Sequence, residues 1–150
     1  MSNNIIFHDE FMVEKVNPDG KKFEKVSRLI CKGILYEVEL LVDINSEIFE
    51  IKVEEKLGVA IARNLSLDGS ETYEQVVGKP SLLDQYDYAM HGVAYKYKHV
   101  EGSTVEVHVS HGGLLARLKG DERHLAGIKV DDEVYTLIRR IEAAPGSSSA

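Results

Sequence analysis

The sequence is short of cysteine and of long apolar runs, and each shortage excludes a class of protein. Cys31 is the only cysteine, so no internal disulfide can form. Because its neighbours are apolar, we expect Cys31 to be a small buried residue and not a nucleophile. A single cysteine also fits a protein of a reducing compartment. No apolar run approaches the roughly 20 residues that a membrane-spanning helix needs. Because Asp9 and Glu10 precede any apolar stretch of signal length, we expect no secretory signal and a cytosolic or nuclear protein.

Positive charge is also in short supply. The 150 residues carry 18 Lys and Arg against 25 Asp and Glu, which gives a net charge of −7. Such a chain repels phosphate backbones on average, which disfavours undirected binding to nucleic acid. The length fits one ordinary domain whose core needs no disulfide. We expect this domain to span residues 1–142, and the small, polar residues 143–150 to form a flexible tail.

The sequence is rich in one pattern, an apolar period of two. In ILYEVELLVD (34–43) every even position is apolar, while the odd positions include Glu37, Glu39 and Asp43. A strand places such carboxylates on one face, whereas a helix would scatter them. Similar or β-rich patterns predict further strands at residues 5–16, 23–30, 47–53, 57–65, 86–98, 105–109, 114–119 and 130–141.

The strands dominate the expected architecture. A single short helical turn is expected at 121–127, and the aperiodic residues 67–83 predict one long surface loop. About eight short, evenly spaced strands predict an all-β fold, either a sandwich or a closed barrel, and we favour a closed antiparallel barrel. Within the strand at 86–98 the apolar residues fall on even positions up to Met90 and on odd positions from Val93. A β-bulge at His91-Gly92 would restore the common face.

Residues with catalytic or metal-binding chemistry do not form a recognisable constellation. His108 and His111 would lie on opposite faces of a strand and have no Cys or carboxylate at ligand spacing. Ser110 and His111 would also point apart, and no G-x-S-x-G elbow is present. The sequence around Gly112-Gly113 lacks a phosphate-binding pattern and a following helix. We therefore expect no catalytic residue, metal, cofactor or small-molecule substrate.

The segment VSHGGLLARLKGD (109–121) is better explained as a strand that starts just after a glycine corner. Leu114, Ala116 and Leu118 would share one face of this strand. Leu115 and Arg117 would share the other. The two glycines then supply backbone freedom for the corner or allow another chain to approach closely.

A basic group gives an alternative function. It follows the turn-forming residues NPDG (17–20) and consists of Lys21, Lys22, Lys25 and Arg28. Together with the tyrosines of 86–98 it is compatible with a freestanding barrel that binds single-stranded nucleic acid by charge and stacking. Glu24 interrupts the basic group, and the acidic balance of the chain disfavours this reading.

Five segments stand in a characteristic order along the chain: NPDGKKFEKVSRL (17–29), LVDINSEIFEIKV (41–53), DQYDYAMHGVAYK (84–96), VSHGGLLARLKGD (109–121) and VDDEVYTLIRRI (130–141). In this order and spacing they resemble the small common subunit shared by eukaryotic RNA polymerases I, II and III, the eighth-subunit family. The resemblance covers nearly all of residues 5–141. The chain departs from the family's usual residues at His111, where an aromatic commonly precedes Gly-Gly, at Val93-Ala94 and at Ala116.

The resemblance implies a barrel of eight or nine antiparallel strands related to the oligonucleotide-binding fold. It also implies a noncatalytic subunit in transcription, docked outside the polymerase core against the largest subunit and neighbouring core subunits. Such a subunit would work in the nucleus, in both nucleolus and nucleoplasm, and residues 67–83 would match a segment that is mobile in the free subunit. Because a barrel opens only at strand ends and corners, the candidate interface residues are His91, Gly92, Gly112, Gly113, Leu114, Leu115 and Arg117.

Overall fold

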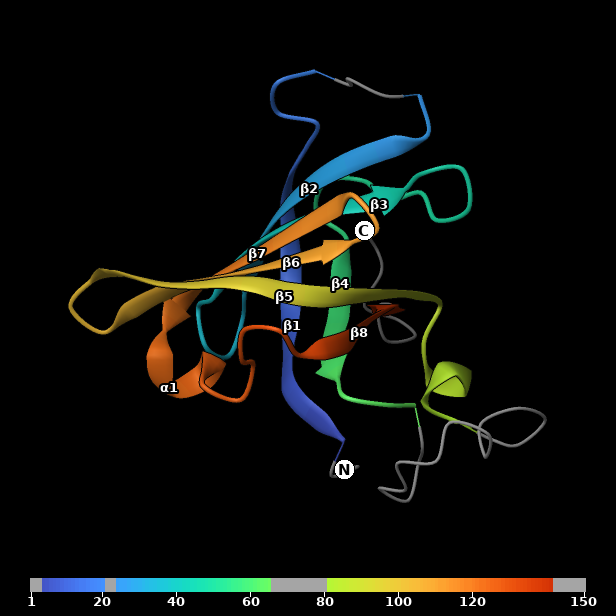
Figure 1. The fold of residues 1–150 in the computed structure, drawn as a ribbon. Coiled ribbons are helices and arrows are strands. Elements are labelled where there is room, and N and C mark those ends of the chain that lie inside the picture. The colour runs from blue at the N-terminus through green and yellow to red at the C-terminus, as the bar shows by residue number, and fades with distance from the viewer. Residues whose placement is uncertain (1–3, 21–23, 66–80, 142–150) are drawn as a thin grey trace.

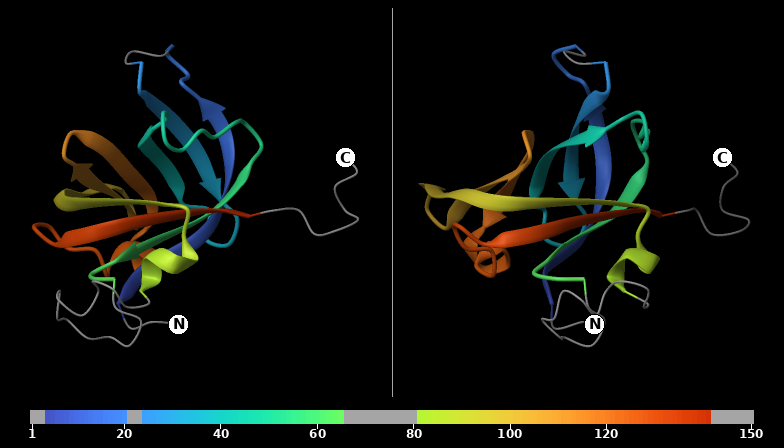
Figure 2. Two further views of the ribbon diagram at one scale, coloured as in Figure 1. Left: turned by 90° about the vertical axis from the view of Figure 1, so that its right-hand side faces the viewer. Right: turned by 45° about the vertical axis from the view of Figure 1, so that its right-hand side comes forward.

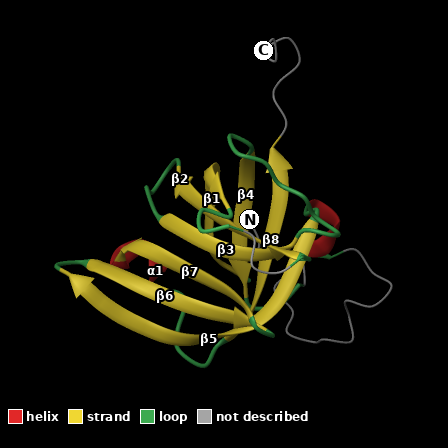
Figure 3. Cartoon of the chain, turned by 90° about the horizontal axis from the view of Figure 1, so that it is seen from above, coloured by secondary structure: helices red, strands yellow, loops and turns green. Residues whose placement is uncertain are grey.

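The computed structural model describes residues 4–20, 24–65 and 81–141, and in this part of the chain eight strands close into a barrel. Figures 1 and 3 show the barrel from the side and from above. The strands are β1 (Ile5–Val16), β2 (Val26–Gly33), β3 (Glu39–Asn45), β4 (Lys56–Ala62), β5 (Tyr88–Glu101), β6 (Thr104–His111), β7 (Leu114–Asp121) and β8 (Glu133–Ile141). All neighbours are antiparallel, in the closed order β1-β2-β3-β7-β6-β5-β8-β4. This confirms the predicted all-β barrel. No helix in the described ranges is long and apolar enough to cross a bilayer.

The period of two produces the barrel core directly. In β6 every second residue is buried, and the residues between them are partly exposed. The inward residues of the other strands join one continuous core, which includes Phe11, Leu29, Leu40 and Leu118. Cys31 belongs to this core, and burial raises the pKa of its thiol to about 12. The thiol is therefore un-ionised at neutral pH, as expected for a structural cysteine.

Strand β4 is buried on both faces. Its inward residues join the barrel core, while Ala60 and Ala62 pack outward against Leu65 and Leu82. Leu82 belongs to η2, a 3-10 helix (Leu82–Gln85) that packs on the outer side of β4 and of Leu137 in β8 and is the yellow-green helix in Figure 2. Small residues on the outer face let η2 approach the sheet closely. Ser81 caps this helix by accepting a hydrogen bond from the Leu83 amide.

The prediction of a strand at 47–53 is wrong. After β3 the chain turns at Asn45, whose carbonyl accepts a hydrogen bond from the Phe49 amide. Residues 49–52 then continue without joining a strand ladder. Phe49 and Ile51 are nevertheless buried, and the Phe49 ring stacks on Tyr88 with centroids 5.0 Å apart. Alternating burial alone therefore produced a strand-like pattern here.

The prediction of a bulge at His91-Gly92 is also wrong. The pairing of β5 with β8 runs without a shift from Tyr88 to Val93, and the register with β6 changes between Ala94 and Lys96. The inward positions are therefore even up to Ala94, and Val93 faces outward. The phase change in the sequence is real, but the extra residue lies farther along the strand.

Other strand boundaries move by a few residues. The prediction of a strand from residue 34 is wrong for residues 34–38, which form the loop between β2 and β3, where Glu37 has a φ of +57°. The expected helical turn is present as α1 (Glu122–Leu125), capped by the Asp121 carboxylate. Of the long loop predicted at 67–83, residues 67–80 lie outside the described residues, as does the predicted tail at 143–150, and the end of the loop enters η2 at Leu82.

Candidate functional site

The glycine corner is the two-residue hairpin turn between β6 and β7. His111 pairs with Leu114, so Gly112 and Gly113 alone form the turn. Both have a positive φ, +65° and +107°, which is the backbone of the hairpin turns that match strand twist and strongly favour glycine. A Cβ at either glycine would meet open space. The pair is therefore selected by backbone conformation and leaves the corner accessible.

The second predicted opening, His91-Gly92, lies against this corner. Gly92 is buried, and a Cβ there would collide with the Ser110 carbonyl oxygen and the His111 ring. The glycine thus permits close packing of β5 on β6 instead of forming a bulge. His91 is exposed, lies 3.3 Å from the Glu133 carboxylate and packs on the ring of Tyr135. The structure therefore brings the two predicted sites together.

Exposed apolar side chains extend from the corner along the outer face of the barrel. Val93 pairs with Ser110, and Ser110 pairs with Leu115, so these three form one row across β5, β6 and β7. Val93, Tyr95 and Leu115 are 39%, 46% and 37% exposed. We call the group of His91, Val93, Tyr95, Leu115 and Arg117 the corner surface. Leu114, by contrast, packs against the barrel core and contributes little to this surface.

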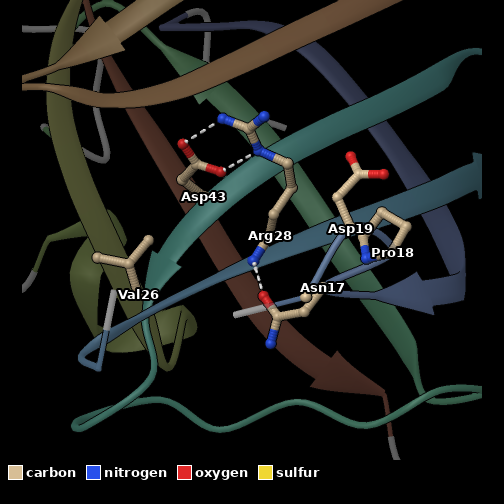
Figure 4. Close-up of a pocket in the computed structure, with 7 residues that line it drawn as sticks. Asn17, Pro18, Asp19, Val26, Arg28 and Asp43 are labelled. Carbon is tan, nitrogen blue, oxygen red and sulfur yellow. Dashed lines mark hydrogen bonds and ion pairs between the residues drawn. The ribbon is translucent and has the colours of Figure 1, made fainter. Parts of the chain in front are cut away.

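A buried carboxylate fixes the corner to the neighbouring strands. Asp43 on β3 accepts a hydrogen bond from the Leu115 amide at 3.1 Å. The same carboxylate binds the Arg28 guanidinium through Nε at 2.7 Å and Nη2 at 3.0 Å, and Figure 4 shows this pair. The hydrogen bonds to Asp43 raise the pKa of Arg28, so its charge is permanent. Asn17 completes the support by accepting a hydrogen bond from the Arg28 amide at 2.9 Å.

His111 is the buried polar residue behind the corner. Its Nε2 lies 2.8 Å from the Thr136 hydroxyl, and its Nδ1 lies 3.1 Å from the Leu114 carbonyl oxygen. The carbonyl can only accept, so Nδ1 carries the proton and Nε2 accepts from Thr136. Burial lowers the pKa of His111, and nearby His91 adds to this effect. The neutral ring therefore acts as a brace between β6, β7 and β8.

Arg117 lies on the outer face of β7, as predicted. Its Nη2 is 3.3 Å from the Glu39 carboxylate, which belongs to the adjacent strand β3. Its Nε is buried and has no hydrogen-bond partner among the described residues. The guanidinium is therefore held against the sheet at the edge of the corner surface, where it supplies a partly neutralised positive charge.

The predicted basic group is only partly visible. Lys21 and Lys22 lie outside the described residues. Lys25 pairs with Glu47 at 3.5 Å, and Arg28 is committed to Asp43. The two described members thus each face a carboxylate, which reduces the positive field that a nucleic-acid phosphate would meet. The nucleic-acid role of this group stays a prediction.

The histidines suspected of metal binding make other contacts. His108 lies 3.2 Å from the Glu106 carboxylate, and His111 is engaged with Thr136. Within the described ranges, no group of three or more His, Cys, Asp or Glu side chains is arranged to hold a metal ion. The hydrogen bonds of both histidines account for their positions in structural terms.

Sequence reasoning missed several residues of the corner surface and its support. It did not place Val93 and Tyr95 on the surface, because the phase change was assigned to His91-Gly92. Had the extra residue of the strand been placed at Tyr95, where the register with β6 changes, the pattern would have put Val93 and Tyr95 on the outer face. It also missed the pairing of Arg28 with Asp43, for which the sequence holds no signal, because the two residues meet only through the β2–β3 register.

Comparison with known proteins identifies the family. The family model described as RNA polymerase Rpb8 matches residues 8–140. The chain is 43% identical over 142 residues to the DNA-directed RNA polymerases I, II, and III subunit rpabc3 of Dictyostelium discoideum, covering 91% of this chain and 98% of the relative. It is 39% identical over 144 residues to subunit 8B of DNA-directed RNA polymerases II, IV and V of Arabidopsis thaliana, covering 93% and 99%.

A fungal relative agrees with the other two. The DNA-directed RNA polymerases I, II, and III subunit RPABC3 of Saccharomyces cerevisiae is 35% identical over 148 residues, with 92% of this chain and 99% of the relative covered. The family match at residues 8–140 contains β2 to β7, most of β1 and β8, and the Gly112-Gly113 corner. The predicted resemblance is therefore confirmed, and the chain belongs to the RNA polymerase Rpb8 family; the three relatives named here are subunits of DNA-directed RNA polymerases.

Proposed function

We propose that this chain is a structural, noncatalytic subunit of nuclear DNA-directed RNA polymerases I, II and III that docks on the largest subunit through the corner surface. The observation that carries this proposal is the family match over residues 8–140, with relatives named as polymerase subunits in an amoeba and a yeast. Such a subunit works where these polymerases transcribe, in the nucleolus and the nucleoplasm.

The noncatalytic role is supported by how the chain uses its reactive side chains. The Cys31 thiol is buried and un-ionised at neutral pH. His111 holds two structural hydrogen bonds, and Asp43 is shared between Arg28 and the Leu115 amide. Groups that are already saturated in this way hold a fold in shape and are poor candidates for proton transfer or nucleophilic attack.

The corner surface is supported as the docking site by its composition. Protein interfaces combine apolar and aromatic anchors at the centre with charged residues at the rim. Leu115, Val93 and Tyr95 supply exposed apolar area, while Arg117 and His91 stand at its edges. The bonds from Asp43 to Leu115 and Arg28 fix the corner before a partner arrives, so little order has to be gained on binding.

The test compares Leu115→Asp with Leu83→Asp. Both leucines are exposed to a similar degree, 37% and 41%, but Leu83 lies on η2, on the outer side of β4 and β8. In cells of the source organism, tagged Leu115→Asp should recover the largest subunit at least about tenfold less than the wild-type chain does, because a charge replaces an interface anchor. Leu83→Asp should recover normal amounts, as quantified by mass spectrometry.

The purified variants separate docking from folding. Both should unfold in urea within about 1 kcal/mol of the wild-type chain, since each change replaces a surface side chain. Normal recovery of the largest subunit by a folded Leu115→Asp chain would refute the corner surface as the docking site. Gly113→Val is a weaker test, because the φ of +107° at this position strains a valine whether or not a partner is present.

A further inference from the structure

A second surface lies at the other end of β7, away from the corner. There α1 and the loop between β2 and β3 flank the first half of β1, as Figure 1 shows. They enclose a groove of about 380 Å³ lined by Ile5, Ile6, Phe7, His8, Leu35, Tyr36, Arg123 and His124. None of these residues belongs to the corner surface, and the groove needs an explanation of its own.

One wall of the groove is an open strand edge. Val13 exchanges hydrogen bonds with Glu54 and Glu55, which places the backbone groups of odd-numbered β1 residues toward β4. The Glu10 carbonyl instead accepts a hydrogen bond from Ile34, on the side of β2. By the same alternation, the backbone N–H and C=O of His8 point away from β4 and into the groove.

Strand β2 ends too early to cover this edge. Its last residue, Gly33, pairs with Phe11, so no strand stands opposite His8 on that side. The loop that follows β2 bonds to the Glu10 carbonyl and to the Asp9 side chain. Among the described residues outside β4, none forms a hydrogen bond with the His8 backbone. Unpaired strand edges of this kind bind extended peptides by adding a strand.

The opposite wall of the groove is preorganised. Asp9, which is 1% exposed, accepts hydrogen bonds from the amides of Leu35 and Tyr36, both at 3.1 Å. This fixes Leu35 with 70% of its surface exposed. The Tyr36 ring stacks on His124 with centroids 4.2 Å apart, which ties the loop to α1. An exposed apolar side chain on a rigid loop is suited to anchor a partner.

Charge indicates the chemistry of the partner. Arg123 stands at the rim with 79% of its side chain exposed, and its bond to Asp121 uses only Nε and Nη2. His8 and His124 lie beside it in the groove. Arg123 is the cation that lines the groove, and the ring nitrogens of the two histidines add possible hydrogen-bond donors beside it, so a carboxylate on the partner is favoured.

We propose that an extended peptide segment of a partner protein, with alternating apolar and acidic side chains, adds as a short strand to β1 beside His8 and is held by Leu35 and by Arg123. Its backbone would bond to the N–H and C=O of His8. An apolar side chain would contact Leu35, and a carboxylate would approach Arg123 and His124. This binding is independent of the docking proposed for the corner surface.

The test uses the full 150-residue chain and a capped hexapeptide of alternating glutamate and valine. Added to the labelled protein, this peptide should shift the backbone amide resonances of His8, Leu35, Tyr36 and Arg123 and slow hydrogen exchange of the His8 amide. Two control peptides separate the contribution of charge from that of backbone hydrogen bonding. One has lysine in place of glutamate, and the other has N-methyl groups that block hydrogen bonds along one edge. Each should bind at least about tenfold more weakly.

Variants of the chain locate the contact. His8→Pro removes the groove-facing N–H while leaving the β4 side of the strand intact, and should weaken binding about tenfold, whereas His8→Ala, which keeps that N–H, should have little effect. Arg123→Gln should weaken binding about threefold, whereas Lys56→Gln, the same charge change on an exposed residue of β4, should not. If His8→Pro fails to fold, the comparison of Arg123→Gln with Lys56→Gln still tests the proposal. Equal binding of the N-methylated peptide, or shifts outside the groove only, would overturn the proposal.

Discussion

Two loops of this barrel are each held by a buried aspartate, and the two arrangements differ in how the charge is compensated. Asp9 is 1% exposed and accepts three backbone N–H groups, from Glu10, Leu35 and Tyr36. Asp43 is 6% exposed and accepts one backbone N–H, from Leu115, together with two bonds from a guanidinium. One carboxylate is therefore compensated by peptide dipoles alone, and the other mainly by an arginine.

The way in which each carboxylate is compensated determines how much stability is lost when that aspartate is replaced. The amides of Leu35 and Tyr36 belong to the loop itself, so the loop at 34–38 and the Asp9 carboxylate stabilise one another. A Cβ at Gly33 would lie 2.5 Å from the Asp9 Oδ2, so only glycine fits where the loop begins beside the carboxylate. Arg28 is partly exposed and can be solvated when its partner is lost. We therefore expect the fold to depend more on Asp9 than on Asp43.

The largest effect is expected from Asp9→Ala. This change leaves three amides without their acceptor and should lower the free energy of unfolding by about 3 kcal/mol, measured by urea titration. Asp9→Asn keeps one acceptor oxygen and should lose roughly half as much. Alkylation of the buried Cys31, which lies two residues before Gly33, should become faster in Asp9→Ala. A loss below about 0.5 kcal/mol in Asp9→Ala would contradict the role given to the amide cradle.

A smaller effect is expected from Asp43→Ala. The Arg28 side chain is 41% exposed, so water can replace the carboxylate, and the loss should be about 1–2 kcal/mol. The double variant with Arg28→Ala should lose less than the sum of the two single variants. Lys25→Ala is the matched control, because its pair with Glu47 is more exposed on both sides and should contribute at most about 0.5 kcal/mol. A loss for Asp43→Ala that exceeds the loss for Asp9→Ala would reverse the comparison.

The same comparison shows what could be predicted from the sequence. The barrel was predictable because inward residues alternate, as in β6 and β7, and alternation is local information. The segment at 47–53 misled because Phe49 and Ile51 are buried without a ladder. The roles of the two aspartates could not be predicted, because only the folded register brings their partners near. The Leu115 amide, for example, is 72 residues from Asp43 in the sequence.

The candidate interface was predictable to a similar extent. Gly112 and Gly113 indicate a turn by residue type alone, and the turn is present. The neighbouring Val93 and Tyr95 depend on which residue of β5 is the extra one, and the sequence allowed more than one position. The groove beside His8 had no signal at all, since it arises because β2 is shorter than β1.

The smallest effect is a pH dependence that comes from His111. Burial lowers the pKa of this residue in the folded chain, whereas an unfolded histidine titrates near 6.5. Between these two values the unfolded chain binds more protons, so stability is unaffected above about pH 6.5 and falls as the pH drops toward the folded pKa. His111→Phe should remove a slope of up to about 1.4 kcal/mol per pH unit in this window.

Urea titrations of both chains from pH 7.5 to pH 5 measure this slope. The difference between the two profiles isolates His111, because the other five histidines are common to both chains. The phenylalanine variant loses the bond to Thr136 at every pH, so its absolute stability should be lower while its profile is flatter. Parallel profiles would mean that the ring behind the corner accepts a proton as readily in the fold as in the unfolded chain. In that case the neutral His111 would not be what braces β6, β7 and β8 at the corner surface.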